Sequence, residues 1–190
     1  LTVASDTTIT GFDFTNATVT NRSTSNVSIR NNTFAGSANG EGAIVFDGAT
    51  DVVIAHNTIT NPNTSSLPGS TVATQIGRGI SVKNGNNIRI TGNTVTGATG
   101  EGIYIENIGT STKNIISGNT VSGMKASEDS NLEGGIFVRN NKNGYIAITG
   151  NTVQDNNLTS GEGFPAARGT NATDGIEVNI CRGGINLDSD

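Results

Sequence analysis

The sequence has no tryptophan, one cysteine, one methionine, one histidine and three prolines in 190 residues. The single cysteine, Cys181, cannot form an internal disulfide. Charged residues make up only 14% of the chain and hydrophobic residues 33%, which excludes a helical bundle because bundle helices are rich in Leu, Ala, Glu and Lys. No apolar run approaches the roughly 20 residues of a transmembrane helix, so we expect no insertion into a membrane.

Basic residues are also scarce, since 11 Lys and Arg stand against 16 Asp and Glu and give a net charge of −5. They are scattered singly along the chain. A protein that binds nucleic acid or an anionic membrane surface needs a concentrated positive patch. We therefore expect neither of them as a partner.

Four residue types dominate the chain, with 26 Gly, 26 Asn, 27 Thr and 16 Ser making up half of it. Gly, Asn and Ser favour turns, and Thr favours strand surfaces. The phrase Asn-Thr-apolar occurs five times, and an Ile stands three residues before each of its asparagines. These asparagines are Asn32, Asn57, Asn93, Asn119 and Asn151. Such regular spacing of apolar residues excludes disorder and indicates a repeat protein.

Each copy of the repeat reads as three short strands of alternating apolar residues, separated by Gly- and Asn-rich turns. Strands this short cannot bury a face alone, so successive copies must stack and pair in parallel at about 4.8 Å. The prediction is an all-β fold, a parallel β-solenoid of about six to seven coils that forms a single domain over 1–190. The repeated asparagines would then share one column at one turn, where their amides can bond from coil to coil.

The phrase Ile-x-Ile-x-Gly-Asn-Thr-Val, at Ile88 to Val95 and Ile146 to Val153, resembles the repeat of right-handed parallel β-helix proteins. These form the pectate-lyase-like superfamily, which includes pectinases and alginate epimerase-like proteins. The resemblance covers about residues 9 to 180 and implies a right-handed helix with an asparagine ladder between the second and third strands. Phe12 and Asn114 depart from the repeat, and we expect irregular packing at both.

The connection from each ladder asparagine to the next first strand varies in length far more than the others. The long connections predict loop excursions at 60–78, 122–134 and 154–173, which would form one wall beside the first strand. Insertions collected on one side of a solenoid often carry binding, although surface loops are also tolerated without function.

Two outward columns of the first strand contain candidate binding residues, because side chains alternate between the two faces of a strand. In the first column Tyr104 and Phe137 lie on neighbouring coils, either as a platform for sugar rings or covered by an excursion or a partner subunit. The second column alternates in charge. It contains Arg22, Asp47, Lys83, Glu106 and Arg139. We expect a coil-to-coil ion-pair ladder there, worth about 0.2 to 1 kcal/mol per pair.

A third column precedes the first strand and is the best candidate for catalysis. It contains Glu41, Arg78, Glu101, Glu133 and Asp174. Glu101 and Glu133 on adjacent coils could act as the carboxylate pair of a glycosidase, with Arg78 as a further catalytic candidate. Stacked carboxylates could instead bind Ca²⁺ with backbone carbonyls, although we assign no metal site, or they could be solvated turn residues.

The resemblance also implies motifs that the enzymes of the superfamily use. Pectate lyases need clustered Asp calcium ligands and an Arg base, which the acidic column matches only loosely. Of the polygalacturonase motifs only Asn-Thr-Asp has a partial counterpart here, at Thr173-Asp174-Gly175-Ile176. The Asp-Pro-His motif of alginate epimerases is absent. Lys83 or Tyr104 could act as a base, whereas His56 beside ladder residue Asn57 reads as a turn residue.

Two functions of different classes fit the sequence. The first is an extracellular or cell-surface structural or adhesive solenoid, which self-associates end to end as a filament or stalk subunit because uncapped solenoid ends expose strand edges. The alternative is a secreted polysaccharide-active enzyme (lyase, hydrolase or epimerase) or a glycan-binding module that uses the groove along the first strand. Its candidate substrate-binding residues are Tyr104, Phe137, Lys83, Glu106, Arg139 and Asp174.

Overall fold

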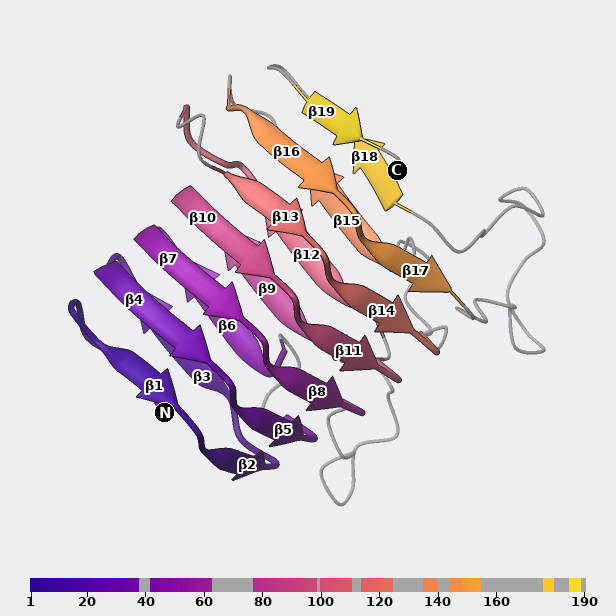
Figure 1. Cartoon of the computed structure of the whole chain (residues 1–190). Coiled ribbons are helices and arrows are strands. Elements are labelled where there is room, and N and C mark those ends of the chain that lie inside the picture. The colour runs from indigo at the N-terminus through magenta and orange to yellow at the C-terminus, as the bar shows by residue number, and fades with distance from the viewer. Residues whose placement is uncertain are drawn as a thin grey trace, which may run out of the picture.

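The computed structural model describes residues 1–37, 42–62, 77–98, 100–110, 114–124, 135–139, 144–154, 176–179 and 185–188. These residues form 19 strands and no helix. The strands belong to three sheets, and every strand pairing is parallel. Figure 1 shows the sheet from β1 to β19 (sheet B) and the sheet from β2 to β17 (sheet C) as adjoining rows of strands. The sheet from β3 to β18 (sheet A) lies behind sheet B. The predicted right-handed parallel β-helix is confirmed.

Each coil contributes one strand to each sheet, so that neighbours in a sheet come from successive coils. Sheet A holds the first strands, β3 (Val19–Arg22), β6 (Ile44–Asp47), β9 (Ile80–Lys83), β12 (Ile103–Glu106), β15 (Ile136–Arg139) and β18 (Ile176–Asn179). Sheet B holds the second strands, β1 (Thr8–Thr10), β4 (Ser25–Arg30), β7 (Thr50–Ala55), β10 (Asn86–Thr91), β13 (Ile115–Ser117), β16 (Ile146–Thr149) and β19 (Ile185–Asp188). Sheet C holds the third strands, β2 (Asp13–Thr15), β5 (Thr33–Ala35), β8 (Thr58–Thr60), β11 (Thr94–Thr96), β14 (Thr120–Ser122) and β17 (Thr152–Gln154).

The core lies inside the coils and consists of columns of Ile, Val and Phe from all three sheets. The registers align Ile29 with Ile54 in sheet B and Phe34 with Ile59 in sheet C, and all four side chains are fully buried. Burying an aliphatic or Phe side chain contributes about 1.5 to 3 kcal/mol. Asn21 is an exception, because it is buried in register with Phe46 and its amide has no hydrogen-bond partner.

The turn before each ladder asparagine needs a left-handed backbone. The residue there has a φ between 53° and 62° in five coils, and these residues are Asn31, His56, Gly92, Gly118 and Gly150. Gly adopts this conformation without steric cost, and Asn tolerates it better than most residues. This requirement repeats in every coil and explains much of the Gly and Asn content. His56 is exposed in this turn, as the sequence predicts.

The asparagine ladder is confirmed at the turn between sheets B and C. The Oδ1 of Asn93 accepts hydrogen bonds from the backbone N–H and the Nδ2 of Asn57, both at 3.0 Å. The Nδ2 of Asn93 in turn donates to Oδ1 of Asn119 at 3.0 Å and to the carbonyl of Ile54 at 2.9 Å. The same pattern links Asn32 to Asn57 and Asn119 to Asn151. The ladder therefore satisfies buried turn groups in each coil.

The two expected irregularities occur where the sequence places them. Phe12 offers no side-chain amide, so the ladder ends with its backbone N–H donating to Oδ1 of Asn32 at 3.0 Å. Asn114 is buried, accepts from the backbone N–H of Ile88 at 3.0 Å and donates to the carbonyl of Tyr145 at 2.9 Å. The Asn114 carbonyl also accepts the backbone N–H of Ala147 at 2.9 Å, so Asn114 joins the coils on both of its sides.

The predicted loop excursions at 60–78, 122–134 and 154–173 lie mostly outside the described residues. The structure describes only 60–62, 77–78, 122–124 and 154 of them. The wall beside the first strand and the single-domain division of the chain therefore stay predictions.

Candidate functional site

Tyr104 and Phe137 lie side by side on the outward face of sheet A, on strands β12 and β15. Their rings are stacked with centroids 5.5 Å apart and planes at 16°. The side chains are buried, with exposed fractions of 8% for Tyr104 and 6% for Phe137. This burial agrees with the expectation that the rings are covered, whereas an open platform for sugar rings would need exposed faces. Their role in substrate binding stays a prediction.

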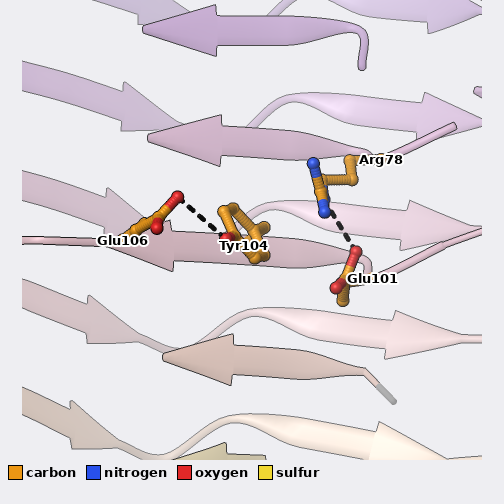
Figure 2. Close-up of polar contacts among 4 residues, drawn as sticks. All are labelled: Arg78, Glu101, Tyr104 and Glu106. Atoms are coloured by element: carbon orange, nitrogen blue, oxygen red, sulfur yellow. Dashed lines mark hydrogen bonds and ion pairs between the residues drawn. The ribbon is translucent and has the colours of Figure 1, made fainter. Parts of the chain in front are cut away.

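Arg78 and Glu101 precede strands β9 and β12 and form an ion pair between adjacent coils (Figure 2). The Nε of Arg78 lies 2.7 Å from Oε2 of Glu101. The side chains are 12% and 2% exposed, so the pair is largely removed from water. Removing one partner of a buried pair leaves an uncompensated charge and typically costs about 3 to 5 kcal/mol. Two of the three catalytic candidates therefore form a structural contact with each other.

Tyr104 connects this ion pair to the charged column. The guanidinium carbon of Arg78 lies 3.8 Å from the centroid of the Tyr104 ring, and Nζ of Lys83 lies 5.9 Å from it. The Tyr104 hydroxyl donates a hydrogen bond to Oε2 of Glu106 at 2.9 Å (Figure 2). Arg78, Lys83, Glu101, Tyr104 and Glu106 thus form one connected set, which we call the sheet A cluster.

The surroundings of Tyr104 raise the pKa of its hydroxyl to about 12. Burial is the largest cause, followed by the hydrogen bond to Glu106 and the charge of its carboxylate, whereas the positive charge of Arg78 acts in the opposite direction. The hydroxyl stays protonated at neutral pH. A general base works best with a pKa near the operating pH, so this environment does not favour Tyr104 as a base.

The column of alternating charge is in register, as predicted. Arg22 lies opposite Asp47, Asp47 opposite Lys83, and Glu106 between Lys83 and Arg139. The predicted ion-pair ladder is wrong, however, because within the described part of the chain the pair of Arg78 and Glu101 is the only ion pair.

The acids of this column bond to neutral groups instead. Asp47 accepts a hydrogen bond from Nδ2 of Asn84 at 2.8 Å, and Glu106 accepts one from Tyr104. Arg22, Asp47 and Arg139 are exposed, where hydration competes with pairing.

Three other members of the acidic column, Glu41, Glu133 and Asp174, lie outside the described residues. The glycosidase pair of Glu101 and Glu133 and the calcium alternative therefore stay predictions. Over the described ranges, no three His, Cys, Asp or Glu side chains gather in a way that could hold a metal ion.

Two features of the outward faces were not predicted from the sequence. Ser81, in register between Val45 and Tyr104, is fully buried and its hydroxyl has no hydrogen-bond partner. On sheet C the threonine that follows each ladder asparagine forms an exposed row along the solenoid. The Asn-Thr repeat could have shown this row, because residues at equivalent places in a repeat fall into one column.

Comparisons with known proteins address the fold. A family model described as "Right handed beta helix region" matches residues 2–187. No curated protein and no solved structure matches the chain significantly. Among the described residues no helix has the length and apolar character to cross a membrane. Since the match spans nearly the whole chain and agrees with the three parallel sheets, the chain belongs to the right-handed β-helix family.

Proposed function

We propose that this chain is an extracellular or cell-surface β-solenoid with a structural or adhesive role, a stalk or filament subunit. The observation that carries the proposal is that side chains of the sheet A cluster bond to one another. Arg78 and Glu101 neutralise each other in a buried pair, and Tyr104 is buried, hydrogen-bonded and protonated. The described side chains best suited to catalysis are thus engaged in contacts that stabilise the coils.

The ladder supports a rod-like role. It runs through five successive coils along the solenoid axis and bonds each coil to the next through buried amides. Because each coil contacts mainly its two neighbours, such bonds add stiffness along the axis. A rigid spacer or stalk needs this property.

We propose end-to-end association for this role because unpaired strand edges are templates for pairing with another chain. Among the described residues Phe12, which precedes strand β2, is a large hydrophobic residue that is 57% exposed and suits such a contact. Head-to-tail contact of this kind is not self-limiting and generates open filaments.

Sedimentation velocity and negative-stain electron microscopy over a concentration series test this role. Wild type should form oligomers or filaments that grow with concentration, and Phe12→Ser should shift the assembly to higher concentration. Arg89→Ser, an exposed change on the middle strand β10, is the control and should behave as wild type. A monodisperse monomer at every concentration would contradict end-to-end assembly.

The second candidate is a polysaccharide-active enzyme or a glycan-binding module. It is favoured by one observation, the gathering of Arg78, Glu101, Tyr104 and Lys83 into one cluster on one face. A screen of acidic and neutral polysaccharides tests it, with the double variant Glu101→Gln plus Glu133→Gln. Cleavage or binding by wild type that the double variant loses would favour this candidate, and activity unchanged in the variant would reject the site.

A further inference from the structure

The outward face of sheet C carries a row of threonines in register. Threonine opens strands β5, β8, β11, β14 and β17, and the strand pairings place these residues directly beside one another. The row consists of Thr33, Thr58, Thr94, Thr120 and Thr152. The second outward row, two residues further along each strand, contains Thr15, Ala35, Thr60, Thr96, Ser122 and Gln154. Hydroxyl groups therefore occupy the first row on five strands and the second row on β2, β8, β11 and β14, and we call these two rows the threonine face.

The hydroxyls of the first row are available to an outside partner. Thr33, Thr58, Thr94 and Thr152 are exposed and Thr120 is half-buried. Throughout the described part of the chain none of these five hydroxyls forms a hydrogen bond within the protein, whereas Thr60 in the second row donates to the carbonyl of Phe34 at 3.2 Å. Each threonine also presents a methyl group, so the face alternates donors, acceptors and small apolar groups.

The positions of these groups are fixed by the fold. Each threonine of the first row directly follows a ladder asparagine, whose buried hydrogen bonds set the backbone at that point. Neighbouring strands are about 4.8 Å apart, and alternate residues of one strand about 6.6 Å apart. Figure 1 shows the strands of sheet C running side by side with little fanning. The registers of sheet C are unbroken from β2 to β17, so the threonine positions repeat regularly along the solenoid.

The chemistry of the threonine face limits its partner. Apart from Asp13 at the first strand, the outward positions of sheet C carry neither charge nor aromatic rings. Individual sugars and polyanions are held by aromatic stacking and by Arg or Lys, which this face lacks. A repeating lattice of neutral donors and acceptors is matched by a repeating grid of hydroxyls. Water oxygens joined by hydrogen bonds of about 2.8 Å at tetrahedral angles have second neighbours at about 4.5 Å, which is close to the strand spacing of about 4.8 Å.

We infer that the threonine face binds ice, with its hydroxyls entering the lattice and its methyl groups holding ordered water in the gaps between them. The sheet A cluster has no part in this activity. The inference goes beyond the proposed structural role, since a solenoid can form filaments whether or not this face binds ice.

Ice-affinity partitioning and nanolitre thermal-hysteresis measurements of the whole chain test the inference. Wild type should enter growing ice and shape the crystals. Thr94→Lys should abolish both effects, because a long charged side chain in the middle of the threonine face keeps the ice surface from contacting the neighbouring hydroxyls. Thr10→Lys, the same exposed change on sheet B, is the matched control and should retain both. Circular dichroism melts would show that all three proteins are folded.

The milder variants Thr58→Val and Thr94→Val remove the hydroxyls, keep the shape and are expected to weaken partitioning. Three results would overturn the inference. Wild type could be excluded from ice without shaping it, Thr10→Lys could lose as much activity as Thr94→Lys, or wild type could bind crystalline cellulose or chitin and not ice.

Discussion

Sheets A and C come from the same coils, yet their outward faces are opposite in character. On sheet A, Tyr104 and Phe137 are buried and stacked, and Arg78 and Glu101 are paired. On sheet C the threonines that follow the ladder asparagines are exposed, apart from the half-buried Thr120, and their hydroxyls form no hydrogen bond among the described residues. The inward columns of both sheets are apolar apart from Asn21 on sheet A, and most of their side chains are buried. The repeat thus determines the core, and each outward face is free to acquire its own contacts.

This difference means that equal substitutions should have unequal effects on the two faces. On sheet A they remove contacts that stabilise the coils. On the first row of the threonine face they remove hydroxyls that form no hydrogen bond among the described residues. Stability measurements can therefore separate the two faces without any knowledge of a ligand.

The largest effect is expected at the asparagine ladder, in the turn that leads from sheet B into sheet C. Asn93→Ala removes two accepted hydrogen bonds from Asn57 and the donated bonds to Ile54 and Asn119. Each buried group left without a partner costs about 1 to 3 kcal/mol, so we expect a loss of about 4 kcal/mol in the free energy of unfolding. Denaturant unfolding measures it. Asn26→Gly removes an exposed amide that bonds to Asp6 and suits the φ of 56° there, so it should lose less than about 1 kcal/mol. Equal losses would contradict the ladder's role.

A smaller loss should follow from Phe137→Ala on sheet A. The ring is 6% exposed and stacked on Tyr104, and truncating a buried Phe costs about 3 to 5 kcal/mol. We expect about 3 kcal/mol by denaturant unfolding. A loss below about 0.5 kcal/mol, as at an ordinary surface site, would show that the ring is exposed in solution.

Tyr104→Phe should cost about 1 kcal/mol, since it removes one hydrogen bond to a carboxylate. It should also change the response to alkali. The folded-state pKa of about 12 lies above the ordinary value of 10, so the stability that Tyr104 contributes is complete below pH 10 and is lost as the pH rises toward 12. The unfolding midpoint should fall more steeply over this interval in wild type than in Tyr104→Phe. Ultraviolet titration of the phenolate would give the same pKa directly.

The smallest effect is expected on the threonine face. Thr94→Val should change the free energy of unfolding by less than about 0.5 kcal/mol, because its hydroxyl bonds to no described group and Val suits a strand equally well. The same unfolding curves measure it. A loss of more than 1 kcal/mol would mean that this hydroxyl belongs to the protein's own contacts.

The sequence was sufficient for the features that repeat. Ile29 and Ile54 were found three residues before a ladder asparagine, and Asn32 and Asn57 were placed in one column, because a solenoid maps equal sequence positions onto equal places. The departure at Asn114 was visible for the same reason.

The candidate site was predictable only in part, because pairing depends on side-chain geometry and not on column membership. The sequence placed Arg78 and Glu101 in one column, but we paired Glu101 with Glu133 as candidate catalytic carboxylates. Alternation of charge also placed Asp47 correctly beside Arg22 and Lys83. The Asp47 carboxylate, however, accepts its hydrogen bond from Asn84, which follows Lys83. Burial of Tyr104 and Phe137 depends on what covers the sheet, which strand periodicity does not encode.

A double-mutant cycle on Arg78 and Glu101 tests the central claim, that these two side chains form a buried ion pair that stabilises the coils. Arg78→Met and Glu101→Leu would be measured singly and together by denaturant unfolding. We predict that each single change costs about 3 kcal/mol and that the double variant recovers most of the loss, since apolar residues can replace a buried ion pair. Small, additive losses would contradict the account and leave these residues free for another function.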